Sequence, residues 1–336
     1  MREIIQNGDG SNVCIIGGAG FIGSHFADAL LARPDTIRLT LFDNFSSGRE
    51  HHFAHHSGDP RLQVVRGDAA DLPALTDAVR KHDLVIHLAS NPDIARAITE
   101  PEIDFYQGTL LTHNVVEAMR RTGVARLLYA SGSGVYGECG ETLLSEDSTP
   151  LQPVSTYGAS KLAGEALIAS YCAMFGLTAC AFRFANVVGA RQTHGVGFDF
   201  LRRLRQDPSR LRILGDGRQS KSYVHVSDVI SAVLLANARI SGEFHVWNVA
   251  TRDAITVTEI AEMAAECLGI DPMPHFDYTG GDRGWKGDVP IVRLDSSRIR
   301  ALGWTPRFSS REAMRRSLDE MVSELAKERV HDYVPA

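Results

Sequence analysis

The sequence predicts an α/β protein built on a doubly wound parallel sheet, with a smaller C-terminal domain. Short apolar, β-prone runs alternate with segments of helical periodicity through the first half of the chain. This alternation is typical of a parallel sheet whose crossover helices cover both faces. Beyond about residue 186 it weakens, because Gly, Pro and basic residues interrupt the segments at 189–223 and 271–290. At 336 residues the chain has room for about two domains.

The expected elements follow one another without an internal repeat. Strands are expected at 13–16, 38–42, 62–66, 84–88, 126–130 and 178–183. Helices are expected at 21–31, 72–81, 106–122 and 157–175. A helix at about 226–238 and a strand at 244–249 should return to the first domain, whereas a helix at about 256–268 belongs to the second. The predicted domains are residues 1–185 with about 226–250, and residues 186–225 with 251–336.

Composition excludes several functions. Hydrophobic residues make up 44% of the chain and charged residues 23%, which is ordinary for a globular protein. The net charge of −6 argues against a surface for nucleic acid or anionic membranes. No apolar run approaches the length of a membrane span, and residues 1–12 lack the apolar core of a signal peptide. Five scattered cysteines without a C-x-x-C pair fit reduced thiols. We therefore expect a cytoplasmic protein with no nucleic-acid or membrane partner.

A glycine turn after the first strand predicts a dinucleotide site. Gly17, Gly20 and Gly23 follow one another at a spacing of three and lead into a helix. Such a turn lets the backbone approach a pyrophosphate and directs the positive helix end at it. Taken alone, the three glycines are also explained by close packing of a helix on a strand. The next strand ends at Asp43, 20 residues beyond Gly23, where a dinucleotide-binding unit places a carboxylate for the ribose hydroxyls. Because that carboxylate would repel a 2′-phosphate, we expect NAD rather than NADP.

Tyr157 and Lys161 are the predicted catalytic pair. They are four residues apart at the start of a helix, so both side chains lie on one face. A neighbouring ammonium favours the phenolate, so we expect the pKa of Tyr157 to be lowered toward the working pH. Tyr157 is then a general acid or base. The alternative is a surface tyrosine and lysine on an amphipathic helix.

A histidine-rich segment suggests, but does not require, a metal. His51, His52, His55 and His56 form two i, i+4 pairs, and on a helix each pair could bind a transition metal. No cysteine accompanies them, and the segment follows the loop residues Ser46-Ser47-Gly48. A solvated loop helix is the favoured interpretation, and no metal site is predicted.

Together, the ordered motifs resemble those of the extended short-chain dehydrogenase/reductase family. The resemblance covers about residues 13–305 and is strongest to the nucleotide-sugar 4-epimerases of the UDP-glucose 4-epimerase type. The motifs are Gly17-x-x-Gly20-x-x-Gly23, Asp43-Asn44, Gly67-Asp68, His87-Leu88-Ala89-Ser90, Val135-Tyr136-Gly137, Tyr157-x-x-x-Lys161, Arg183 to Gly189, and Gly215-Asp216-Gly217-x-Gln219. The resemblance implies a Rossmann domain that binds NAD, a smaller C-terminal domain that binds the nucleotide sugar, and a homodimer formed through the helices at 106–122 and 157–175.

The resemblance also implies roles for individual residues. The cofactor would be bound by Gly17, Gly20, Phe21, Ile22, Gly23, Asp43, Asn44, Phe45, Ser46, Ser47, Gly48, Asp68, Ala69, Leu88, Ala89, Ser90, Ser131, Tyr157 and Lys161. Tyr157 would take the proton from the sugar 4-hydroxyl as hydride leaves C4 for NAD. Substrate would be bound by Ser133, Tyr157, Asn186, Lys221, Arg283 and Val292, with Lys221 and Arg283 at the diphosphate.

Three positions depart from the family pattern. Gly132 stands where the family has a serine or threonine that relays a hydrogen bond to the sugar, and Ser133 or Ser131 is the expected substitute. Gly108 replaces an asparagine near the nicotinamide end. Lys221 replaces an arginine that binds phosphate, and Ser222 after it replaces an aspartate, so the charge remains but the bidentate geometry is lost.

These residues favour one reaction among several. Dehydratases of the family carry a Thr-Asp-Glu run where this chain has Gly132-Ser133-Gly134, and decarboxylases carry a glutamate at the position of Gly134. A reductase would need NADPH, which Asp43 opposes. Epimerisation at C4 of UDP-glucose, UDP-galactose or their N-acetyl forms is therefore predicted, with another nucleotide-sugar reaction or a non-catalytic dinucleotide-binding protein as alternatives.

The residue at position 292 bears on which sugars the pocket admits. Val292 stands where these epimerases have a tyrosine that restricts the sugar pocket, so a 2-acetamido group would fit. Equally, Val292 is explained as ordinary strand core.

Overall fold

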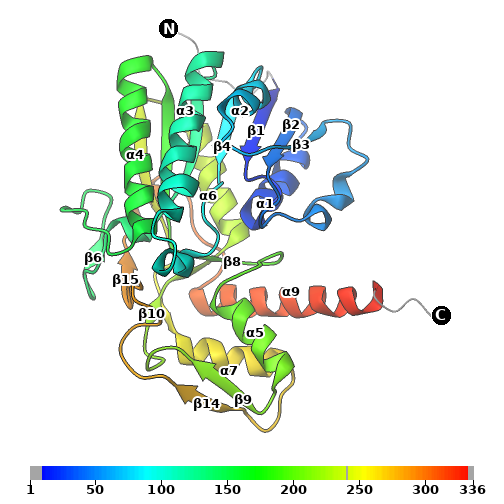
Figure 1. Cartoon of the computed structure of the whole chain (residues 1–336), viewed down its shortest axis with the longest axis vertical. Coiled ribbons are helices and arrows are strands. Elements are labelled where there is room, and N and C mark those ends of the chain that lie inside the picture. The colour runs from blue at the N-terminus through cyan, green and yellow to red at the C-terminus, as the bar shows by residue number, and fades with distance from the viewer. Residues whose placement is uncertain (1–9, 240, 332–336) are drawn as a thin grey trace.

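The chain is built on a seven-stranded parallel sheet in the order β12-β7-β5-β4-β1-β2-β3. A computed structural model describes residues 10–239 and 241–331 (Figure 1). The parts of the predicted domains at 1–9, 240 and 332–336 lie outside the described residues. The strands are β1 (Ser11–Ile16), β2 (Thr36–Asp43), β3 (Leu62–Arg66), β4 (Leu84–His87), β5 (Arg126–Gly132), β7 (Thr178–Phe184) and β12 (Phe244–Val249). The prediction of a parallel α/β sheet is confirmed.

Helices cover both faces of this sheet and bury apolar side chains against it. The helices are α1 (Phe21–Leu31), α2 (Leu72–Val79), α3 (Leu111–Thr122), α4 (Thr156–Phe175) and α6 (Val226–Arg239). Phe26 of α1 and Val229 of α6 are buried in one core cluster, while Leu75 of α2, Met119 of α3 and Ile168 of α4 are buried in the other. Figure 1 shows α3 and α4 side by side. The predicted helix at 106–122 begins as a π-helical turn, Phe105–Leu110.

A third core lies away from the sheet, in the lower part of Figure 1. There α5 (Val196–Gln206), α7 (Val257–Cys267) and α9 (Ser310–His331) pack on one another. Thr256 and Glu259 form a capping box that begins α7. The sequence analysis missed α5, because the glycine and basic residues at 189–223 were taken as interruptions, and it assigned no helix to the segment that forms α9. A short α8 (Ser297–Ala301) precedes α9.

One small sheet joins the two parts of the chain. A four-stranded sheet has the order β13-β10-β15-β6, and two further pairs are β8 with β11 and β9 with β14. Their bounds are β6 (Leu143–Leu144), β8 (Asn186–Val188), β9 (Arg210–Ile213), β10 (Ser220–Lys221), β11 (Tyr223–His225), β13 (Ile255–Thr256), β14 (His275–Tyr278) and β15 (Ile291–Leu294). In β10 and β15, Lys221 lies opposite Val292, so both predicted substrate residues sit on neighbouring strands.

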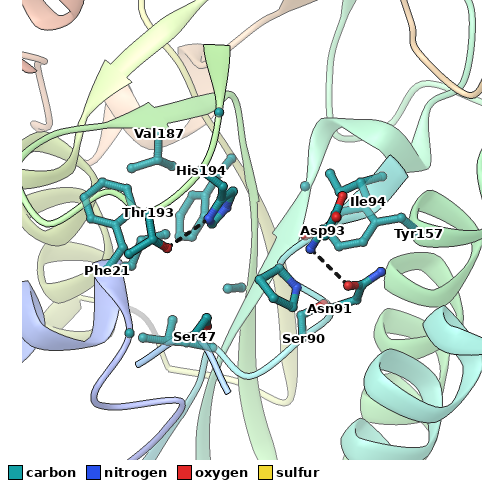
Figure 2. Close-up of a pocket in the computed structure, with 18 of the residues that line it drawn as sticks. Phe21, Ser47, Ser90, Asn91, Asp93, Ile94, Tyr157, Val187, Thr193 and His194 are labelled. Carbon is teal, nitrogen blue, oxygen red and sulfur yellow. Dashed lines mark hydrogen bonds between the residues drawn. The ribbon is translucent and has the colours of Figure 1, made fainter. Parts of the chain in front are cut away.

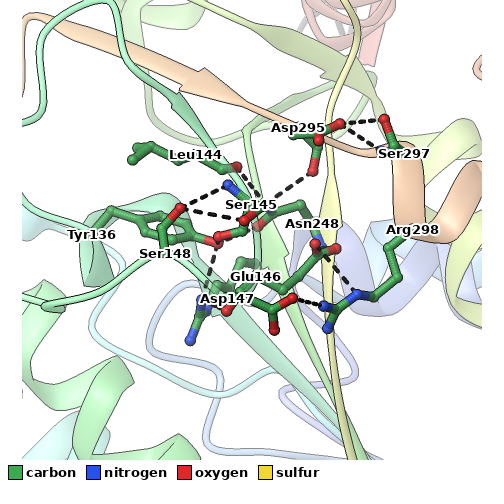
Figure 3. A network of polar contacts seen from close by, with 11 residues as sticks. Tyr136, Leu144, Ser145, Glu146, Asp147, Ser148, Asn248, Asp295, Ser297 and Arg298 are labelled. Atoms are coloured by element: carbon green, nitrogen blue, oxygen red, sulfur yellow. Dashed lines mark hydrogen bonds and ion pairs between the residues drawn. The ribbon is translucent and has the colours of Figure 1, made fainter.

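The polar network in Figure 3 fixes the Val135-Tyr136-Gly137 motif to this junction. Asn248 of β12 donates from its side chain to the Leu144 carbonyl and accepts from the Tyr136 hydroxyl at 2.8 Å. Arg298 of α8 pairs with Asp147. Tyr136 is only 2% exposed, so this motif tyrosine has a structural role rather than a place in the site.

Two expectations about composition can be compared with the structure. The five cysteines form no disulfide. None of the helices in the described ranges combines the length and the apolar character that crossing a bilayer requires.

Candidate active site

One cavity of about 1100 Å³ runs from the glycine turn, past the carboxyl ends of the central strands, to the short strands of the second part. Ligands of parallel α/β sheets bind at this edge of the sheet. Figure 2 shows Phe21, Thr193 and His194 on one side of the cavity and Ser90, Asn91 and Tyr157 on the other. The cavity is large enough for a dinucleotide and part of a second ligand.

The glycine turn is as compact as the spacing predicts. Gly17 has φ +83°, and a β-carbon there would lie 2.7 Å from the backbone nitrogen of Ala89. A β-carbon at Gly23 would lie 2.4 Å from the Gly17 carbonyl oxygen. Gly20 is the N-cap of α1 and offers no capping side chain, so the first N–H groups of the helix face the cavity. This is the cradle that a pyrophosphate requires.

Asp43 is oriented by the same turn. Its carboxylate accepts hydrogen bonds from the backbone N–H of Ala19 at 2.9 Å and of Phe45 at 2.7 Å. Burial raises the pKa of Asp43, and the two N–H groups oppose that rise. The carboxylate also lines the cavity, where it can accept from a ribose hydroxyl.

Most of the predicted cofactor residues line this cavity, but two do not. The Phe45 ring lies under the Arg66 guanidinium, 4.1 Å from its ring centre, instead of facing the cavity. Gly48 packs against Ala19 and the Asp43 carboxylate. The predicted residues that line the cavity are Gly17, Gly20, Phe21, Ile22, Gly23, Asp43, Asn44, Ser46, Ser47, Asp68, Ala69, Leu88, Ala89, Ser90, Ser131, Tyr157 and Lys161.

Tyr157 and Lys161 lie together in the cavity wall, as predicted, but the electrostatic expectation was wrong. Ser155 caps α4 by accepting from the Gly158 N–H at 3.0 Å, which fixes the start of the helix that carries Tyr157 and Lys161. Burial raises the pKa of Tyr157 to about 12, and the nearby Ser90 hydroxyl opposes this only in part. Burial also lowers the pKa of Lys161 to about 8.

The position of the ammonium explains this result. Lys161 Nζ donates to the Ala130 carbonyl at 2.8 Å and lies 5.4 Å from the centre of the Tyr157 ring. The ammonium is therefore held by the backbone rather than by the phenol oxygen. Desolvation, which disfavours the phenolate, is the larger effect on Tyr157.

A buried aspartate behind this pair was not anticipated. Asp104 is 1% exposed and accepts hydrogen bonds from Asn91 at 2.8 Å and from Thr156 at 2.6 Å. Its charge raises the pKa of both Tyr157 and Lys161. An aspartate before a helix is common, so the sequence carried no signal for this role.

The structure separates the two candidate replacements for the missing relay hydroxyl. Ser131 donates to Glu165 at 2.5 Å, and Glu165 forms a buried ion pair with Arg183 at 2.7 Å, so this hydroxyl is committed to a structural network. Ser133 lines the cavity at the start of a 3-10 turn. Gly132 is extended, and a β-carbon there would have no heavy atom within 4 Å apart from its chain neighbours.

Comparison with known proteins decides the family. The sequence model of the NAD dependent epimerase/dehydratase family matches residues 13–250, most of the chain. The chain belongs to this family. NAD is therefore its cofactor, which agrees with the carboxylate at Asp43 and with the glycine cradle described above.

Relatives within the epimerase/dehydratase family carry more than one activity. A UDP-glucose 4-epimerase of Mycolicibacterium smegmatis is 31% identical over 91% of this chain and 96% of its own length. A dTDP-glucose 4,6-dehydratase of an Actinoplanes species is 31% identical over 88% of this chain and 92% of its own. A crystal structure of a UDP-galactose 4-epimerase is 36% identical, with a TM-score of 0.82 over 94% of this chain and 99% of that one.

The second part of this family member supplies the far end of the cavity. Asn186, Lys221 and Val292 line it, with Val292 8% exposed. Lys221 Nζ is 2.5 Å from an Asp288 carboxylate oxygen. Arg283 does not line the cavity, because its guanidinium pairs with Glu138 at 2.6 Å.

Two lining residues of this part were missed. Arg203 of α5 donates to the Arg212 carbonyl at 3.1 Å and forms no ion pair with any carboxylate in the described part of the chain. Trp285 lies close over Gly287, where a β-carbon would come within 2.4 Å of the indole ring. Amphipathic spacing on α5 is the signal that would have found Arg203, whereas Trp285 sits in a loop without a regular pattern.

Proposed function

We propose that this protein inverts C4 of a nucleotide-diphosphate hexose, UDP-glucose/galactose or their N-acetyl forms, through a transient 4-keto sugar. The observation that carries the proposal is the position of Tyr157 and Lys161 in one cavity wall. They lie between the glycine cradle at one end and Asn186, Lys221 and Val292 at the other. A group at this position can hold the proton of a sugar hydroxyl while the sugar stays bound.

The chain's own residues handle the proton. Bound NAD supplies the acceptor and then the donor of hydride for C4, and its oxidised ring brings positive charge that favours a phenolate. Tyr157 accepts the proton of the 4-hydroxyl as that carbon is oxidised, and it returns the proton when the opposite face is reduced. The Lys161 ammonium, 5.4 Å from the centre of the Tyr157 ring, lowers the cost of the phenolate once it forms. Asp104 orients the start of α4 through Thr156.

We propose that residues 1–185 with about 226–250 bind NAD and that 186–225 with 251–336 bind the nucleotide sugar. Arg203 and Lys221 are cations in the cavity wall that suit the diphosphate, and Lys221 would exchange its Asp288 partner for phosphate on binding. Arg283 is left out because it does not line the cavity. Val292 leaves room beside the sugar, so we expect turnover of UDP-GlcNAc and UDP-GalNAc at least as fast as of the unacetylated pair.

We also propose that the protein is a homodimer through α3 and α4. The C-terminal end of α4 exposes Met174 (71% exposed) and Phe175 (45% exposed), which are large apolar side chains on an outer helix. A second copy of α4 would bury them.

A 4,6-dehydratase is the second candidate, because one relative with this activity is as similar as the epimerase. Elimination of water requires an acid and a base near the sugar. The cavity residues 132–134, next to Tyr157, are Gly-Ser-Gly and provide neither group. This favours epimerisation.

The test is incubation of the purified protein with UDP-, GDP-, CDP- and dTDP-hexoses, followed by anomeric proton NMR. We expect a C4 epimer and no net change in NAD, and we expect Tyr157→Phe to lose at least about 100-fold in turnover while still binding NAD. A 4-keto-6-deoxy product would identify a dehydratase. NAD binding without turnover of any sugar would identify a non-catalytic protein, and an unimpaired Tyr157→Phe variant would refute the mechanism.

A further inference from the structure

The histidine segment ends at a cluster that no part of the proposed reaction uses. His55 and His56 close the 3-10 helix Ala54–His56, and the Nε2 atom of each lies 2.8 Å from the same Asp28 oxygen, Oδ1. The three ligand-type atoms lie within 4.8 Å of one another. The i, i+4 pairing considered from the sequence is wrong. The segment folds as two separate 3-10 turns, and His52 is buried with Nδ1 2.9 Å from the Ala19 carbonyl oxygen.

The geometry of the cluster is close to that of a metal site. The two imidazole rings have centroids 4.0 Å apart and direct their Nε2 atoms at one oxygen. Zinc binds imidazole nitrogen and carboxylate oxygen at about 2.0–2.2 Å, so tetrahedral ligands are separated by about 3.3 Å. The existing 2.8 Å separations therefore need to open by about half an ångström.

The surroundings support a ligand role for Asp28. Arg191 donates to the other carboxylate oxygen, Oδ2, at 2.7 Å. Ligating carboxylates are commonly held in this way by a hydrogen-bond donor on the oxygen that does not bind metal. The guanidinium charge also repels a cation, so we expect moderate rather than very tight affinity. Side-chain exposures of 49% for His55, 31% for Asp28 and 20% for His56 leave one side of the cluster open to water.

We propose that Asp28, His55 and His56 form a binding site for a divalent transition metal of the zinc type, with water as the fourth ligand. Two imidazoles favour zinc, cobalt, nickel or copper over magnesium or calcium, which require oxygen ligands. A metal there would tie α1 to the segment that follows the predicted cofactor residues Ser46, Ser47 and Gly48. That segment already reaches the glycine turn, because the Arg49 N–H and His52 Nδ1 both contact the Ala19 carbonyl oxygen. The site therefore concerns the stiffness of this loop and not the chemistry at Tyr157.

The test uses Co²⁺ as the probe, because tetrahedral Co²⁺ absorbs visible light. The full-length chain, freed of any purification tag and treated with EDTA, is titrated with Co²⁺ and then with Zn²⁺. We expect one Co²⁺ per chain at micromolar concentration, displaced by Zn²⁺, and a higher melting temperature with Zn²⁺ than with EDTA. Asp28→Asn, His55→Ala and His56→Ala should each weaken binding by at least about tenfold.

His51→Ala is the matched control, because His51 is an exposed histidine of the same segment outside the cluster. It should bind Co²⁺ as the parent does. The histidine variants should melt at the parent temperature in EDTA, which separates loss of a ligand from loss of the fold. Absence of one-to-one binding in the parent, or equal affinity in the three ligand variants, would overturn the proposal.

Discussion

A serine at position 132 would test whether the missing hydroxyl, which in the family relays a hydrogen bond to the sugar, limits the rate. Gly132 has extended backbone angles (φ −159°, ψ 165°), which any residue adopts. A β-carbon there would point into open space within the cavity wall. Gly132→Ser should therefore fold without strain, and the reduced freedom of the unfolded chain should stabilise it by about 0.4–1 kcal/mol.

The expected gain in rate follows from one new hydrogen bond. A neutral hydrogen bond contributes about 0.5–1.5 kcal/mol. If it forms only as the proton moves, kcat should rise by about 2- to 10-fold. Gly132→Ala is the matched control, because it makes the same backbone change without the hydroxyl.

The assay is the initial rate of C4 inversion by NMR for both variants and the parent, with thermal melting alongside. We expect the serine variant to exceed the alanine variant in kcat while the two melt together. Equal or lower kcat for serine, in a variant that retains NAD and the parent's stability, would refute the idea that Gly132 marks a missing relay.

Three further predictions follow from the structure. Burial lowers the pKa of Lys161 from 10.5 to about 8, so the folded chain binds fewer protons than the unfolded chain between these values. The difference in melting temperature between the parent and Lys161→Met should therefore shift in favour of the parent as the pH rises from 8 to 10. A difference that does not change with pH would contradict this prediction. Val292→Tyr should lower kcat/KM for UDP-GlcNAc by at least about tenfold while sparing UDP-glucose, and equal losses on both would show that Val292 is only core. Arg183→Met leaves Glu165 buried without its cationic partner and should lower the free energy of unfolding in urea by about 3–5 kcal/mol. The matched control is Arg311→Met, which removes an exposed ion pair and should lower the free energy of unfolding by under about 1 kcal/mol. Similar losses for both would contradict the burial argument.

Where the sequence failed, long-range contacts decided the outcome. The pKa of Tyr157 depends on how completely the ring is buried and on where Lys161 Nζ points, and neither follows from a spacing of four residues. Arg283 was assigned to the diphosphate by its position in the chain, but its guanidinium pairs with Glu138, which is 145 residues away. Asp28 meets His55 and His56 only because α1 and the histidine segment pack together.

The sequence alone determined the features that depend on residues near one another in the chain. A glycine turn between a strand and a helix, a carboxylate at the end of the next strand, and a tyrosine and lysine on one helix face all depend on neighbours a few residues away. The tertiary structure decided which of these groups face the cavity, which are neutralised by distant partners, and which gather into new clusters. Burial and ion pairing between segments far apart in the chain control charge and access, and these are properties of the packed molecule rather than of any one stretch.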